Sequence, residues 1–170
     1  MMDISFAQGL GLVSFVLGIS TFYQKNDRRL KLMMVVFNLN HMVHYLLLGA
    51  VTSAVSAMLS ACRSGLSIKY KSKRLAYCFI ACNIVIGLNI AEQLVDLLPI
   101  IGTSIGTYAM FCLNGIKMRL AFLVGATVWL INNIVVGSWG GILLESTLLT
   151  VNIITIYRLS RSPLVIQTPH

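Results

Sequence analysis

The chain has 170 residues, of which 57% are hydrophobic and 11% are charged, and its mean hydropathy is +0.84. A soluble domain carries roughly 25% charged residues, so this composition excludes a water-covered surface and indicates a protein embedded in lipid. The net charge of +8 would otherwise suggest nucleic acid as a partner. Here the basic residues stand at the ends of apolar runs. We therefore expect the lipid bilayer, and no nucleic acid, as the partner.

Seven apolar segments approach the ~20 residues that an α-helix needs to cross a bilayer. In chain order they cover residues 4–23, 30–48, 51–68, 75–91, 95–113, 118–136 and 138–157. The segment at 75–91 is the shortest. The sequence therefore predicts an all-α, polytopic membrane protein with seven transmembrane helices. A single transmembrane domain covers residues 1–161, and residues 162–170, with two prolines, form a disordered tail.

Charge in the connecting loops predicts the orientation. The basic loops follow the first, third, fifth and seventh segments; they contain Lys25, Arg28, Arg29, Lys31, Lys69, Lys71, Lys73, Arg74, Lys117, Arg119, Arg158 and Arg161. The alternate loops and the N-terminus contain Asp3, Glu92 and Asp96, with no lysine or arginine. Basic loops stay in the cytoplasm. Seven spans with the N-terminus outside and the C-terminus in the cytoplasm place every loop lysine and arginine inside.

The second half of the chain repeats the plan of the first half at an offset of 88 residues. Corresponding pairs are Gly18 and Gly106, Asn26 and Asn114, Arg29 and Lys117, and Gly49 and Gly137. Repeat one covers about residues 4–70, a linker helix about 74–91, and repeat two about 95–158. Four helices separate the repeats, so both run in the same direction. This predicts a 3+1+3 arrangement of parallel three-helix repeats.

Charged side chains inside a predicted span indicate a candidate functional site. A charged group is costly in lipid, so such a side chain usually faces the protein interior. Glu145 lies about 10 Å into the seventh segment, at ~1.5 Å per residue. It either lines a pathway or forms a structural hydrogen bond to a neighbouring helix. Arg63 either binds or pairs with an anion, or it snorkels to the cytoplasmic face and anchors its helix. A direct ion pair between Arg63 and Glu145 would require the two side chains to span a long distance between their helices.

Other polar residues lie at helical spacing on three segments. Ser53, Ser56, Ser60, Ser64 and Ser67 form a stripe on the third segment. Asn38, His41, His44 and Tyr45 lie on the second segment, and Trp129, Asn132 and Asn133 lie on the sixth. The serines favour close helix packing, with a polar pathway wall as the alternative. The histidines are compatible with substrate contact, proton coupling or interhelical hydrogen bonds, and two of them without a carboxylate or cysteine beside them do not predict a metal site.

The run Lys117-Met118-Arg119, together with Trp129, Asn133, Gly137, Glu145 and Asn152, resembles the YgjV family of bacterial inner-membrane proteins. The first half agrees at Ala7-Gln8-Gly9 and Arg28-Arg29. The resemblance covers nearly all of residues 4–158 and implies the bacterial inner membrane, but it brings no substrate. In its arrangement the chain distantly resembles the SWEET, SemiSWEET, PnuC and PQ-loop transporters, although the Pro-Gln hinge of the last is absent.

We therefore expect alternating-access transport of a small polar metabolite, bound near the midplane between the two three-helix units. The predicted substrate-binding residues are Asn38, His41, His44, Tyr45, Arg63, Trp129, Asn132, Asn133, Glu145 and Asn152. Trp129 is expected to stack on a planar or sugar-like group, and His41 or Glu145 to exchange a proton if transport is coupled. The alternative is a non-transporting receptor or accessory binding protein on the same scaffold. Without catalytic or phosphate-binding motifs, we expect neither an enzyme nor a cofactor or metal; a homo-oligomer is compatible with this interpretation.

Overall fold

The computed structural model describes residues 2–22, 27–70, 72–113 and 115–161, and the predicted tail at 162–170 lies outside them. Within these ranges the chain forms seven α-helices and one short 3-10 turn. They are α1 (Met2–Phe22), α2 (Asp27–Leu47), α3 (Val51–Leu66), α4 (Lys73–Ile90), η1 (Leu94–Asp96), α5 (Leu97–Cys112), α6 (Gly115–Val136) and α7 (Trp139–Arg161). The prediction of an all-α chain is confirmed.

The prediction that the fourth segment is the shortest is wrong. α4 has 18 residues, whereas α3 and α5 have 16 each. α4 begins early because the Ser72 side chain accepts a hydrogen bond from the Arg74 backbone N–H and caps the helix. α5 begins late because η1 precedes it, with the Asp96 carboxylate accepting the backbone N–H groups of Glu92 and Gln93.

The outer surface of the bundle is apolar. Within the described part of the chain, four helical stretches are long and apolar enough to cross a bilayer, namely Lys73–Ile90, Leu94–Cys112, Ile116–Val136 and Trp139–Tyr157, and Phe6–Thr21 is a shorter apolar stretch. Large hydrophobic side chains such as Leu88 and Val85 remain more than half exposed. Lipid is the solvent that matches such a surface, so this is a polytopic membrane protein.

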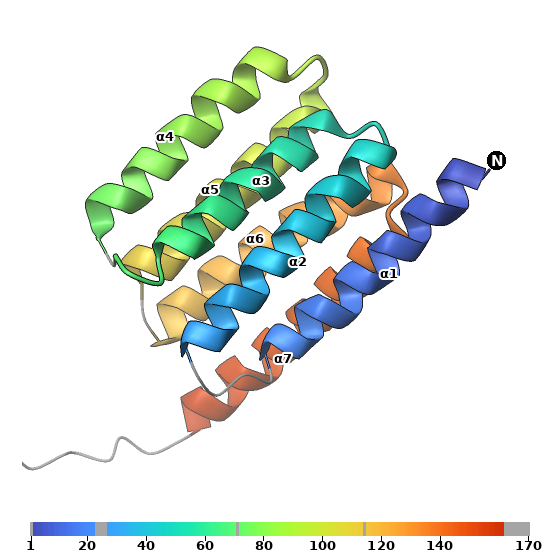
Figure 1. The fold of residues 1–170 in the computed structure, drawn as a ribbon. Coiled ribbons are helices and arrows are strands. Elements are labelled where there is room, and N and C mark those ends of the chain that lie inside the picture. Colours follow the sequence, from blue (N-terminus) through green and yellow to red (C-terminus); the bar gives the residue numbers. More distant parts are fainter. Residues whose placement is uncertain (1, 23–26, 71, 114, 162–170) are drawn as a thin grey trace, which may run out of the picture.

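The helices form two stacked layers (Figure 1). One layer contains α1, α2 and α3, and the other contains α7, α6 and α5, with α1 packed on α7 and α3 packed on α5. α2 and α6 face each other at the centre, where their side chains meet. α4 lies at one edge, against α3 and α5. Because the connections are short, successive helices run antiparallel, and α1, α3, α5 and α7 share one direction.

The corner between α2 and α3 has the same backbone geometry as the corner between α6 and α7. Gly49 and Gly137 both have φ of +73°, a left-handed conformation that glycine adopts without strain. The next residue in each corner, Ala50 or Ser138, donates its N–H to the carbonyl five positions earlier at 2.9 Å. The two corners are 88 residues apart, which is the offset of the sequence repeat.

α1 and α7 approach each other closely at a pair of glycines. A Cβ atom added to Gly140 would lie 2.0 Å from the carbonyl oxygen of Gly11. Small residues at such crossings let two backbones pack directly in a membrane. Gln8 strengthens the same junction, because its amide donates to the Gly137 carbonyl at 2.7 Å and accepts the Trp139 N–H at 3.1 Å.

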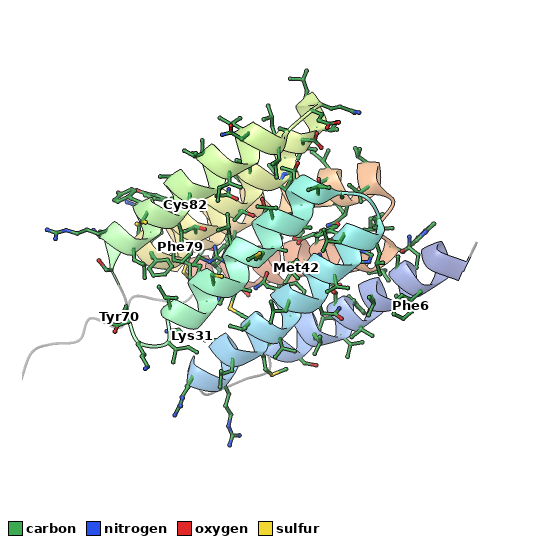
Figure 2. All side chains as sticks on the ribbon, turned by 45° about the horizontal axis from the view of Figure 1, so that its top comes forward. Phe6, Lys31, Met42, Tyr70, Phe79 and Cys82 are labelled. Atoms are coloured by element: carbon green, nitrogen blue, oxygen red, sulfur yellow. The ribbon has the colours of Figure 1, made fainter. Side chains whose placement is uncertain are left out.

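The two ends of the bundle differ in charge. The basic end carries Arg28, Arg29, Lys69, Arg74, Lys117 and Arg119, and the acidic end carries Glu92 and Asp96 beside the two glycine corners. Figure 2 shows Lys31 and Tyr70 toward the basic end and Phe6 toward the opposite end. The sequence-based orientation assigns the basic end to the cytoplasm.

Gly140→Ala should destabilise the protein by about 1–3 kcal/mol, because the added methyl group has no space against the α1 backbone. Gly9→Ala is the matched control, since a Cβ atom there meets nothing within 4 Å. Unfolding of both variants in detergent micelles measures the difference. Equal stability of the two variants would contradict the close contact between α1 and α7.

Candidate functional site

A chain of buried hydrogen bonds joins α2 to α6 at the centre of the bundle. The Tyr45 hydroxyl donates to Asn133 Oδ1 at 2.6 Å and lies 2.9 Å from His41 Nε2. Because that hydroxyl proton is directed to Asn133, the phenol oxygen accepts from His41, which fixes the proton of the neutral imidazole on Nε2. Two atoms of this hydrogen-bonded network, His41 Nδ1 and Asn133 Nδ2, are buried and have no partner among the described residues. The network therefore ends in one free acceptor and one free donor.

His44 ties α2 to the helices on either side of it. Its Nδ1 lies 2.7 Å from the Ala7 carbonyl oxygen, which only accepts, so a neutral His44 carries its proton on Nδ1. Its Nε2 then accepts from the Ser138 hydroxyl at 2.7 Å. The same hydroxyl oxygen accepts the Gly141 N–H at the start of α7, as an N-cap serine does. His44 is fully buried and holds α1, α2 and α7 together.

Trp129 stacks on Tyr45, with ring centroids 5.7 Å apart and planes inclined by 20°. Its other neighbour is α5, where a Cβ atom on Gly102 would lie 2.7 Å from the indole. We expected Trp129 to stack on a planar or sugar-like ligand. In this conformation Tyr45 occupies that face, so a ligand could use the indole only after the two rings separate.

Glu145 is a buried carboxyl group on α7. It is 9% exposed, and it makes no hydrogen bond or ion pair within the described part of the chain. It lies within electrostatic range of the Tyr45 hydroxyl. No Arg63–Glu145 pair forms among the described side chains. An unpartnered carboxyl group in this position is a candidate for ligand binding or proton exchange.

A cavity of about 320 Å³ opens at the acidic end, between the first glycine corner, the α4–α5 connection and the end of α6. Its lining includes Ser53, Asn132, Gln93, Glu92 and Asp96. Ser53 and Asn132 exchange two hydrogen bonds, at 3.2 and 3.1 Å, and link α3 to α6. The cavity thus reaches the junction between the two layers.

Below the cavity, buried polar residues follow α3 toward the basic end, and we call this line the α3 polar seam. It comprises Ser53, Ser56, Ser60 and Arg63, with Asn132, Asn83 and Thr107 as their partners. Asn83 of α4 accepts from Ser56 at 3.1 Å and donates to the Ile100 carbonyl and the Ser104 hydroxyl of α5. These bonds clamp α3, α4 and α5 together. Of the serine stripe, Ser53 and Ser56 bond to neighbouring helices, whereas Ser64 and Ser67 donate to carbonyls of α3 itself.

Arg63 points into the bundle. Its Nη1 donates to Thr107 Oγ1 of α5 at 2.6 Å, and only 7% of the residue is exposed. The alternative in which Arg63 snorkels to the cytoplasmic face is therefore wrong. Thr107 lies in the second half of α5. Its contact with Arg63 holds the guanidinium group between α3 and α5.

Two predicted site residues lie apart from the central network. Asn38 is buried but donates to the Met34 carbonyl one turn earlier on its own helix. Asn152 donates to the Leu148 carbonyl and accepts from Arg119 at 3.3 Å, near the basic end. The structure therefore brings together His41, His44, Tyr45, Trp129 and Asn133, with Glu145 within electrostatic range of Tyr45. It places Asn132 and Arg63 along the α3 polar seam.

Sequence reasoning missed Asn83, Thr107, Ser138 and Gln8. Asn83 is 2% exposed on a helix whose side chains are mostly exposed, and an asparagine in the middle of an apolar segment was the available signal. The other three are single polar residues, and only their three-dimensional partners distinguish them. Among the described residues no group of histidine, cysteine and carboxylate side chains forms a metal site.

The fold and this interior define the class: a polytopic α-helical membrane protein with a polar centre. The sequence model of a family described as bacterial inner membrane protein, YgjV type, matches residues 5–163. The chain is also 36% identical to inner membrane protein YgjV of Escherichia coli (strain K12) over 155 residues, which is 91% of this chain and 85% of the relative. No solved structure matches the chain. The protein belongs to the YgjV family and is a multi-pass protein of the bacterial inner membrane.

Tyr45→Phe should destabilise the protein by about 1–3 kcal/mol, because it leaves Asn133 Oδ1 buried without its donor. Tyr70→Phe, at an exposed tyrosine, is the control and should leave stability unchanged. Combining Tyr45→Phe with Asn133→Ala should give a coupling of about 0.5–3 kcal/mol in a double-mutant cycle measured by unfolding in detergent. Additive effects would contradict a direct bond between the two side chains.

Proposed function

We propose that this protein is a transporter, not an enzyme, and that it passes a small polar metabolite across the inner membrane by alternating access. Seven transmembrane helices would form two parallel three-helix units, α1–α3 and α5–α7, joined by α4 as the linker. The ligand would bind between the two units. The observation that carries this proposal is the polar cavity at the acidic end, whose floor is the Ser53–Asn132 pair at the junction of the two units.

Contacts between equivalent residues support the two-unit arrangement. Tyr45 and Asn133 are 88 positions apart and bond to each other directly. In a twofold assembly, equivalent residues meet only at the axis, so these two side chains would mark it. The packing of α1 on α7 matches the packing of α5 on α3, as the same axis requires. This relation, with the axis along the membrane normal, is that of parallel repeats in transporters.

Hydrogen bonds tie neighbouring helices together near the basic end in this conformation. Lys31 donates to the Ser67 carbonyl at the end of α3, and its equivalent in the second unit, Arg119, donates to Asn152 of α7. Arg63 and Thr107 join α3 to α5 near the same end. A cavity at the acidic end and polar ties at the basic end support the proposal that this conformation is the outward-facing one of an alternating-access cycle.

The centre offers the chemistry for a neutral or partly charged polar ligand. His41 Nδ1 can accept and Asn133 Nδ2 can donate, and neither has a partner among the described residues. Glu145 adds a carboxyl group within electrostatic range of Tyr45. Separation of α2 from α6 would expose these groups and the Trp129 face together. The proposed ligand therefore has hydrogen-bonding groups on a planar or sugar-like body, and Glu145 is the proposed proton carrier if transport is coupled.

The closed centre favours a second candidate function. The Tyr45–Asn133 bond and the two bonds of His44 join α1, α2, α6 and α7 without a ligand. A receptor or accessory binding protein would use such a rigid interior as scaffold and the acidic-end cavity as its binding site. This alternative requires a ligand that binds without crossing the membrane.

A library of sugars, nucleosides, vitamins and amino acids should contain a ligand that stabilises the purified protein. A ligand at 100 times its Kd stabilises by ~2.7 kcal/mol, which thermal unfolding in detergent resolves. The radiolabelled hit should accumulate in proteoliposomes containing the wild-type protein, and Glu145→Gln should abolish accumulation. Ser146→Ala, at the lipid-exposed neighbour on α7, is the control and should transport normally.

Two results would each contradict one part of this proposal, the first transport itself and the second the role of Glu145. Binding of the hit without accumulation in proteoliposomes would favour the receptor or accessory function. Normal uptake by Glu145→Gln would remove Glu145 from the mechanism, whatever its role in folding.

A further inference from the structure

Arg63 is a buried cation without a counter-charge among the described side chains. It lies in the last turn of α3 and is 7% exposed. Its Nη1 donates to the neutral hydroxyl of Thr107, and its Nε is buried with no hydrogen-bond partner. Glu92 and Asp96 lie at the opposite end of the bundle, and Glu145 of α7 forms no ion pair within the described residues. The guanidinium therefore has donors to spare and no anion to receive them.

The position of Arg63 in its helix does not by itself offset this burial. A cation in the last turn is stabilised by the partial negative charge at the helix C-terminus. That effect is small compared with the cost of removing an unpaired charge from water, which buried ions recover only through a partner of opposite sign. A counter-ion supplied from outside the chain would provide that partner.

Two residues one helical turn from Arg63 and Thr107 have further hydroxyl groups. Thr103, one turn before Thr107 on the same face of α5, has a buried hydroxyl group without a partner among the described residues. Ser60, three residues before Arg63, makes no side-chain hydrogen bond among the described residues. The Thr107 hydroxyl has no donor to spare, because it accepts from Arg63 and donates to the Thr103 carbonyl at 2.7 Å. Thr107 thus positions the guanidinium, while Arg63 Nε and two hydroxyls stay available.

We propose that Arg63, Ser60 and Thr103 form a binding site for an oxyanion, a phosphate or carboxylate group that enters between α3 and α5 from the basic end. Guanidinium and hydroxyl donors are the groups that recognise such oxygens. Phosphate of an inner-leaflet phospholipid and a free cytoplasmic anion present the same chemistry. The site is separate from the acidic-end cavity and does not depend on transport.

The test is thermal unfolding of the protein in a phosphate-free detergent at constant ionic strength, with chloride as the balancing anion. One arm titrates inorganic phosphate and the other titrates short-chain phosphatidylglycerol into the micelles. The wild-type melting temperature should rise and saturate in at least one arm. A rise with phosphate identifies a free anion as a ligand, and a rise with the phospholipid alone identifies a lipid headgroup. Arg63→Gln should remove the rise, and Lys117→Gln, at an exposed cation of the basic end, should retain it.

A second variant keeps the test valid if Arg63→Gln does not fold. Thr103→Val removes a buried hydroxyl without a partner, so the anion-free melting temperature should equal or exceed that of the wild type. The half-saturating anion concentration should rise about tenfold, as expected for the loss of one hydrogen bond to a charged group. A purely structural role of Arg63 would leave that concentration unchanged. No wild-type response in either arm, or an equal response in Arg63→Gln, would overturn the proposal.

Discussion

The hydrogen bond from Tyr45 to Asn133 is the contact on which the interior depends. In a bilayer no water is available to satisfy polar groups, so a buried polar side chain is stabilised by a partner inside the protein. Tyr45 of α2 and Asn133 of α6 supply partners for each other and orient His41 and Trp129 around them. Because α2 and α6 are the middle helices of their layers, this bond holds the two layers in register. The outer helices then pack on each other on both sides.

The interior contains two buried charged residues that form no ion pair among the described side chains. Arg63 and Glu145 are both buried, yet they lie on different helices and do not pair with each other. A protein selected for stability alone would lose these charges, because hydrophobic residues of similar volume serve at least as well. The two groups, without an ion pair among the described residues, support the proposal that the protein binds a ligand inside the membrane. The acidic-end cavity and the basic-end ties give the two sides of the membrane different access to that interior.

Much of the fold could be predicted from the sequence, because lipid makes hydropathy and loop charge strong signals. The seven helices follow from apolar segment length, and the 88-residue offset aligns two glycines that prove to share one φ value. The site was harder to predict. His41, His44, Tyr45, Trp129 and Asn133 do converge, yet Asn38 bonds to its own helix, and Trp129 stacks on Tyr45 where a ligand was expected. Helix rotation and packing decide which polar residues form pairs, and the sequence gives neither. The partners of Asn83 and Thr107 could therefore not be assigned. For the same reason, snorkelling of Arg63 was an open interpretation.

Sided labelling of a cysteine at position 53 tests the central claim most directly. Ser53 lies at the base of the cavity and at the head of the α3 polar seam. In a variant with Cys62, Cys78, Cys82 and Cys112 replaced by serine, Ser53→Cys is exposed to a membrane-impermeant maleimide from one side of the membrane at a time. Alternating access predicts modification from the acidic side and, in a fraction of molecules, from the basic side, with the ratio changed by a bound ligand. Modification from the acidic side alone, with and without ligand, would contradict the account.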